Sequence, residues 1–183
     1  MDVLGVVLRV AAYGVLAAAL GVAAVTDLAR RVVPNGCVVA VAVSGAAQAC
    51  AGVLLGGSAS QACLRSVCGL TCALVVMLAT AAVSARIRGT PGVGGGDVKL
   101  LAAVGVWVGP ARVLVVIALS CLVAVAGWVV LRIVASWAAR GNARASASPL
   151  ARDGRALAQG IPLAPAIALS ALVMVLLGGA SYG

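Results

Sequence analysis

The sequence contains no histidine, and this absence removes several classes of enzyme. Without an imidazole the chain cannot form a Ser-His-Asp triad, a Cys-His pair or an HExxH zinc site. Lys99 is the only lysine, so a Ser-Lys dyad has a single candidate base. Serine-type intramembrane proteases that use a histidine base are therefore excluded, and so are zinc metalloproteases.

Acidic residues are almost as scarce. The chain has no glutamate, and its four acids are Asp2, Asp27, Asp97 and Asp153. Any chemistry that needs a carboxylate must use members of this set. Asp2 lies at the terminus and Asp153 in a polar segment, so both are interpreted as solvated charges.

Charged residues of either sign make up only 9% of the 183 residues, whereas 64% of the residues are hydrophobic. An average soluble domain is about 25% charged and about 45–50% apolar. A soluble fold of this length could not bury so much apolar surface, and disorder requires low hydrophobicity. The composition therefore predicts a polytopic membrane protein.

The positive charge and the cysteines point to no nucleic-acid or metal site. The net charge is +9, but aromatic residues are only 3% and no basic cluster exceeds two residues, so the charge is interpreted as a topology signal. The six cysteines form no CxxC pair, and most lie in apolar runs where cysteine packs as a small hydrophobe. No metal and no cofactor are expected.

Apolar segments of near-spanning length predict an all-α bundle of about six transmembrane helices. The fourth segment is much shorter than the others. At about 1.5 Å per residue it covers roughly 16 Å, about half of a hydrocarbon core, so it is either a short span or a re-entrant piece. The segments are Val3–Val25, Gly36–Leu55, Val67–Ala85, Val98–Val108, Val113–Leu131 and Ile161–Leu177.

The basic residues decide whether the short segment crosses, because loops on the inner side carry an excess of Lys and Arg. If it crosses, ten basic residues lie inside, and only Arg9, Arg65 and Arg112 lie outside. If it does not, the division is six to seven and the bias is lost. We therefore predict six spans, with both termini outside. The inner loops are Thr26–Asn35, Arg86–Asp97 and Ser136–Gly160.

Two of the acids fall at the predicted inner interface. Asp27 follows the first span and Asp97 precedes the short fourth segment, so the six-span arrangement places them on one side at similar depth. A carboxylate in or near a bilayer is costly and is by default a candidate functional residue. We expect Asp27 and Asp97 to meet across the bundle.

The neighbouring residues suggest how each carboxyl is presented. The glycines from Gly94 to Gly96 permit a tight turn and a close approach just before Asp97, which then stands at a helix N-terminus. Lys99 lies close to Asp97 and favours its ionised form. Pro34 stops the first helix from continuing. Asn35 is expected to cap the second helix.

A pair of carboxyl groups a few ångströms apart can activate water without metal or histidine. Like-charge repulsion keeps one of them protonated. The ionised partner then acts as general base on water, and the neutral partner donates to the substrate carbonyl, as in aspartic proteases.

The segments around these two residues resemble the type IV prepilin peptidase family, membrane proteases of the GxGD aspartyl class. Asp27 followed by Val33-Pro34-Asn35 is similar to the family's Asp and Ile-Pro-Asn, with Val in place of Ile. The run Gly94-Gly95-Gly96-Asp97-Val98-Lys99 matches its Gly-x-Gly-Asp-x-Lys. The run Ile161-Pro162-Leu163-Ala164-Pro165 is similar to its Ile-Pro-x-Gly-Pro, with Ala164 in place of Gly.

The resemblance implies a membrane-embedded aspartic endopeptidase with Asp27 and Asp97 as its catalytic pair. It would remove the basic leader from prepilin-like (type IV or Flp-type) subunits at the cytoplasmic face of the cell membrane. The protein substrate would present a basic leader and a hydrophobic helix, and no nucleic acid is involved. Because the chain has few acids, we expect anionic lipid headgroups to hold the leader while a helix groove holds the apolar segment.

The chain departs from the family pattern at two points, and two other classes of function stay open. A basic residue often stands two positions after the first Asp, where this chain has Ala29. The cysteine-rich insertion of long members is missing, so we expect residues 1–183 to form a single peptidase domain without a methyltransferase domain. The alternatives are a small transporter or secretion-assembly subunit in which Asp27 and Asp97 relay ions or protons, and a proteolytically inactive scaffold.

Overall fold

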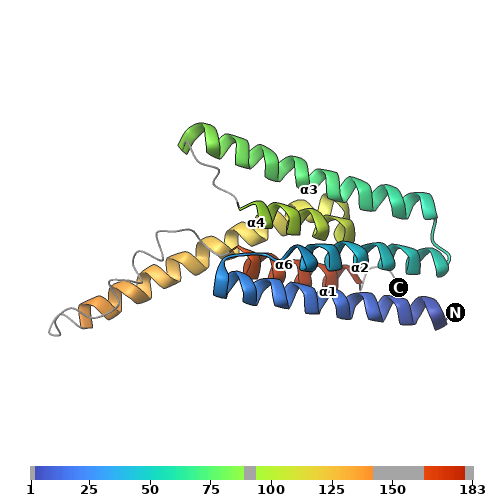
Figure 1. The fold of residues 1–183 in the computed structure, drawn as a ribbon, viewed down its shortest axis with the longest axis horizontal. Helices are drawn as coiled ribbons and strands as arrows, with labels where there is room; N and C mark the ends of the chain where they lie inside the picture. The colour runs from blue at the N-terminus through green and yellow to red at the C-terminus, as the bar shows by residue number, and fades with distance from the viewer. Residues whose placement is uncertain (1–2, 89–93, 142–162, 180–183) are drawn as a thin grey trace.

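The chain folds into a bundle of long helices, as the computed structural model shows for residues 3–88, 94–141 and 163–179 (Figure 1). Within these ranges there is no β-strand, which confirms the predicted all-α class. Asp2 and Asp153 lie outside the described residues. The helices are α1 (Val3–Arg30), α2 (Asn35–Leu54), α3 (Ala59–Arg88), α4 (Gly95–Gly141) and α6 (Ala164–Gly179).

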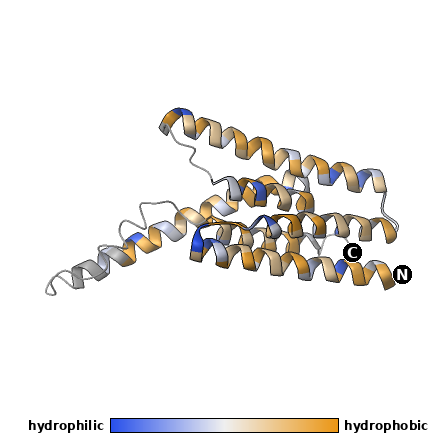
Figure 2. Cartoon of the chain, viewed as in Figure 1, coloured by the Kyte–Doolittle hydropathy of each residue, from blue (hydrophilic) through white to orange (hydrophobic). Residues whose placement is uncertain are grey.

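Four of these helices are long and apolar enough to cross a membrane, namely α1, α2, α3 and α4, whereas α6 is shorter. Apolar colours cover the middle of the bundle in Figure 2, and hydrophilic residues gather toward the helix ends. Leucine and valine side chains face outward all along the helices, as expected where lipid rather than water is the surrounding solvent. The protein is a membrane protein with a helical-bundle fold.

Helix α4 is divided by a kink and forms two helical segments of the bundle. Gly109 has backbone angles of φ 78° and ψ 176°, which a residue with a side chain rarely adopts, and Pro110 follows it. The first half of α4 runs from the Asp97 end of the bundle to this kink, where Arg65, near the start of α3, donates to the Val108 carbonyl at 3.3 Å. The short fourth segment therefore runs from the Asp97 end of the bundle to the kink at Gly109, where the chain reverses its direction.

The second half of α4 returns antiparallel to α6. Arg112 lies against Gly178 at one end of this pair, and Ser120 and Ser170 share a buried hydrogen bond of 2.6 Å further along. The described part of the bundle therefore has six helical segments, and the start of α1 lies at the same end as the end of α6 (Figure 1). We call the end of the bundle where Arg112 lies the arginine end, and the end where Asp97 lies the aspartate end.

Two glycines bring α3 and the first half of α4 into backbone contact. A Cβ atom added to Gly105 would stand 2.7 Å from the carbonyl carbon of Gly69, and one added to Gly69 would stand 2.9 Å from the Cα of Gly109. Small residues at such a crossing let two helices approach closely in a membrane bundle. The contact fixes how far the first half of α4 reaches along α3.

Several predicted boundaries were wrong because hydropathy marks the apolar part of a helix rather than its ends. Residues 26–30 of the first predicted loop continue α1, and residues 136–141 of the third continue α4. Helix α3 begins at Ala59 and ends at Arg88, so it extends beyond the predicted span at both ends. The remainder of the third predicted loop, residues 142–160, lies outside the described residues.

Candidate active site

Asp27 occupies the last turn of α1 and is buried, with only 7% of its surface exposed. Its carboxylate Oδ2 accepts a hydrogen bond of 3.2 Å from the backbone N–H of Ala164, the first residue of α6. The first N–H groups of a helix have no partner within the helix, and its dipole favours negative charge there. Asp27 therefore supplies the acceptor that the start of α6 requires.

Asp97 stands in the first turn of α4, as the sequence predicted. Its backbone N–H donates to the Gly94 carbonyl at 3.1 Å, which closes the tight turn. The carboxyl is partly buried, and its Oδ1 atom has no hydrogen-bond partner among the described residues. The two carboxyl groups lie near enough for the charge of Asp27 to act on Asp97.

The segment after Asp27 packs directly on the segment before Asp97. A Cβ atom added to Gly96 would stand 3.1 Å from the Cβ of Val33, which is closer than carbon atoms normally pack, so a side chain there would push the two segments apart. A second link is the hydrogen bond of 3.5 Å that Lys99 Nζ donates to Asn35 Oδ1. Two segments that lie far apart in the sequence are thereby held as one unit.

The expected capping role of Asn35 was wrong. The N-cap of α2 is Pro34, in extended conformation (φ −63°, ψ 133°), and it makes no side-chain cap hydrogen bond. Asn35 is the first helical residue, and its side-chain oxygen faces Lys99 instead. The Pro34 carbonyl accepts from the Cys37 N–H at 3.0 Å, so the backbone alone begins the helix. The expected break before Pro34 is present, because α1 ends at Arg30.

The three glycines before Asp97 have different surroundings. A Cβ atom at Gly94 would stand 3.1 Å from Asp97 Oδ2, so Gly94 leaves space beside the carboxyl. A Cβ atom at Gly95 would have no atom within 4 Å. The structure therefore gives a steric reason for glycine at Gly94 and Gly96 but not at Gly95.

The third sequence motif reaches the same site through its backbone. Ile161 and Pro162 lie outside the described residues, whereas Ala164 is fully buried and donates its N–H to Asp27. This hydrogen bond was not anticipated, although the motif itself was recognised. Because the donor is a backbone group, alanine can supply it as well as glycine. Ala29, the other residue at which the chain departs from the family pattern, is exposed on α1.

The described part of the chain holds no cluster of three or more His, Cys, Asp or Glu side chains that could bind a metal ion. Each of the six cysteines is a free thiol in the structure. The described residues at the aspartate end thus include two carboxyl groups, Lys99, Asn35 and the guanidinium groups of Arg30 and Arg31 at the end of α1.

Fold and site together define a class of protein: a polytopic membrane bundle that holds two interacting carboxyl groups between its helices. A family model described as the type IV leader peptidase family matches residues 14–129, more than half of the chain and both aspartates. The chain belongs to this family, and it is a peptidase-family membrane protein. Comparison with curated proteins gives no match, and neither does comparison with solved structures.

Proposed function

We propose that the protein is an aspartic endopeptidase that removes the basic leader from prepilin-like subunits of the type IV or Flp type, with Asp27 and Asp97 as its catalytic pair. One observation carries this proposal. Three segments far apart in sequence meet at the two carboxyl groups, through the contacts Val33–Gly96, Lys99–Asn35 and Ala164–Asp27. Such convergence organises a site for chemistry, and the family of the chain is one of peptidases.

We assign the role of general base to Asp27. It accepts the Ala164 N–H at the start of α6, and both this hydrogen bond and the helix dipole favour a carboxylate there. The carboxylate takes a proton from a water molecule as the water oxygen attacks the carbonyl carbon of the scissile peptide bond. When the C–N bond of the tetrahedral intermediate breaks, Asp27 gives this proton to the leaving amine nitrogen.

We assign the role of acid to Asp97. A buried carboxylate oxygen without a hydrogen-bond partner is costly when charged, and Asp97 Oδ1 has none among the described residues. A neutral Asp97 donates to the substrate carbonyl oxygen and stabilises the charge that develops on it. Pro34, Asn35, Gly94, Gly96 and Lys99 shape the site by holding the two segments together.

Cleavage of a co-expressed prepilin, followed by mass spectrometry of the pilin N-terminus, tests the pair. Asp27→Asn and Asp97→Asn should each abolish processing, while both variants still insert in the membrane. Asp153→Asn removes a carboxylate from another part of the sequence and should leave processing intact. Normal processing in either site variant would refute the dyad. The same mass spectra test our expectation that the new N-terminus carries no methyl group added by this enzyme.

The experiment also separates the other classes of function. An ion or proton relay predicts no cleavage by the purified wild-type protein, together with a transport defect in the two variants. An inactive scaffold predicts no cleavage and no dependence on either carboxyl. Reconstitution in vesicles that expose only one end of the bundle tests the proposed location of the site at the cytoplasmic face of the cell membrane.

The substrate leader is basic, and the described residues at the aspartate end offer only two carboxyl groups. We therefore propose that anionic lipid headgroups hold the leader near the site. Cleavage by the purified enzyme should be faster in vesicles that contain anionic lipid than in neutral vesicles. Equal rates in the two would show that lipid charge plays no part.

A further inference from the structure

A large pocket lies at the arginine end, away from the aspartate pair. Its volume is about 820 Å³, and residues from all five helices line it. Arg9 lines this pocket and lies near the start of α1, whereas Asp27 lies near the end of the same helix. At about 1.5 Å per residue the two are roughly 27 Å apart along the helix, close to the thickness of a hydrocarbon core. The pocket is thus separate from the proposed active site.

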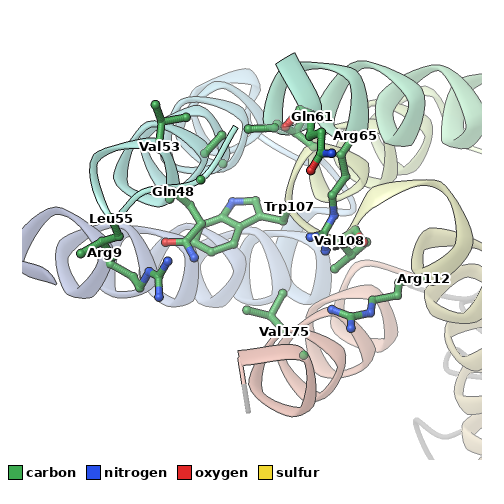
Figure 3. A pocket seen from close by; sticks show the side chains of 18 of the residues that line it. Arg9, Gln48, Val53, Leu55, Gln61, Arg65, Trp107, Val108, Arg112 and Val175 are labelled. Atoms are coloured by element: carbon green, nitrogen blue, oxygen red, sulfur yellow. Dashed lines mark hydrogen bonds between the residues drawn. The ribbon is translucent and has the colours of Figure 1, made fainter. Parts of the chain in front are cut away.

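Three positive charges converge on this pocket from three helices. Arg9 comes from α1, Arg65 from α3 and Arg112 from α4, and all three guanidinium groups are directed to the space around Trp107 (Figure 3). They are the three basic residues that the sequence places on the outer side. Arg65 and Arg112 are close enough for their charges to act on one another. A cavity lined by several positive charges favours an anionic ligand over a neutral one.

Two buried polar atoms of the pocket have no hydrogen-bond partner among the described residues. One is a donor, the Nε–H of Arg9, and the other is an acceptor, the Oε1 of Gln48. Arginines at membrane ends usually extend to the interface and keep the guanidinium in water. Arg9 instead buries its Nε atom in the wall of the pocket. Both atoms are shielded from solvent, so a ligand pairs with them only when the Arg9 and Gln48 side chains turn toward the cavity, and it must then offer an acceptor to Arg9 and a donor to Gln48.

Trp107 gives the pocket a fixed wall. Its indole Nε1–H donates to the Val41 carbonyl at 3.0 Å and to Ser44 Oγ at 3.3 Å, and its ring lies 5.2 Å from that of Tyr13. The indole ring packs closely on Gly45, where a Cβ atom would stand only 2.9 Å from the ring. The pocket is therefore built from held side chains rather than left between loosely packed helices.

We propose that this pocket binds the headgroup of an anionic phospholipid that carries a free hydroxyl, of the phosphatidylglycerol type. The phosphate oxygens accept from the arginine guanidinium groups, including Arg9 Nε, which is the strong class of charge-assisted hydrogen bond. The headgroup hydroxyl donates to Gln48 Oε1. A pocket of this size is within the range of small-ligand sites, and acyl chains can lie along the apolar outer surface of the bundle. This proposal does not depend on peptidase activity.

Thermal unfolding of the full-length protein in neutral-detergent micelles tests the site. Phosphatidylglycerol added to the micelles should raise the unfolding temperature in a concentration-dependent way. Phosphatidylcholine, which has a phosphate but no net charge, should give a much smaller rise. Inorganic phosphate forms a third arm: a rise with phosphate as large as that with lipid assigns the site to free phosphate, and a rise with lipid alone assigns it to the headgroup.

Three variants test whether the residues of this pocket are responsible for stabilisation by the lipid. Arg9→Met should weaken the apparent affinity for phosphatidylglycerol by about tenfold or more, as expected for loss of a hydrogen bond to a charged group. Gln48→Leu should weaken binding of phosphatidylglycerol but not of phosphatidate, whose headgroup lacks the glycerol hydroxyls. Arg132→Gln removes one positive charge outside the pocket and should change the binding of neither phosphatidylglycerol nor phosphatidate. Lipid stabilisation that is absent in the wild type, or equal in Arg9→Met and the wild type, would overturn the proposal.

Discussion

Replacing Gly96 with alanine should impair cleavage, whereas the same change at Gly95 should not. A Cβ atom at Gly96 would stand 3.1 Å from Val33 Cβ and 3.3 Å from its Cγ2, while a Cβ atom at Gly95 would meet nothing within 4 Å. Carbon atoms are in optimal contact at about 3.5–4.0 Å, so the Val33 segment must move by at least about 0.4 Å. A misplacement of about 1 Å can cost roughly 100-fold in rate, so about tenfold is expected for Gly96→Ala.

The assay is the initial rate of prepilin cleavage by each purified variant, with thermal unfolding measured on the same samples. Unfolding temperatures near that of the wild type would show that a lower rate comes from the site and not from loss of the fold. Adding Val33→Ala to Gly96→Ala removes the Cγ2 contact and should restore part of the rate. Equal rates for the Gly95 and Gly96 variants, or no effect of the second substitution, would refute the steric reasoning.

Two further predictions concern stability, and thermal unfolding in detergent checks both. Gly105→Ala should destabilise the bundle by about 1–3 kcal/mol, because the added Cβ atom would meet the Gly69 backbone. On the same helix, a Cβ atom at Gly127 would meet nothing within 4 Å, so Gly127→Ala should stabilise the bundle by up to about 1 kcal/mol. Shifts of the unfolding temperature in the same direction for both variants would contradict this reasoning. Ser120→Ala and Ser170→Ala should each cost about 1 kcal/mol, and the double variant less than their sum, because the two hydroxyls bond each other at 2.6 Å. Strict additivity would show that this hydrogen bond contributes nothing.

The sequence predicted the features that depend on composition and local backbone chemistry. Hydropathy located the helices, and the chain reverses its direction at Gly109-Pro110, where the short segment Val98–Val108 was predicted to end; that this segment crosses the membrane stays a prediction. The glycines before Asp97 indicated a turn into a helix, and the structure has one. Each of these follows from a few neighbouring residues, so no tertiary contact is needed to infer it.

The features that sequence missed depend on contacts between distant segments. Asn35 has the side chain of a helix cap, yet the Lys99 ammonium brought beside it by the fold competes for its oxygen. Ala164 was recognised only as a departure from a motif, and its N–H became relevant because the start of α6 lies against Asp27. The gathering of Arg9, Arg65 and Arg112 at one pocket is likewise a property of the folded bundle.

The two helices that meet at Gly69 and Gly105 extend to unequal distances toward the aspartate end. Beyond this crossing α3 continues as far as Arg88, whereas α4 reaches Asp97 over a much shorter stretch. At about 1.5 Å per residue, α3 extends roughly 16 Å further than Asp97. Helix α1 ends less than one turn after Asp27, so it forms no such barrier. The far end of α3 therefore restricts how closely a bulky molecule can approach the two carboxyl groups from its side of the bundle, whereas the end of α1 does not.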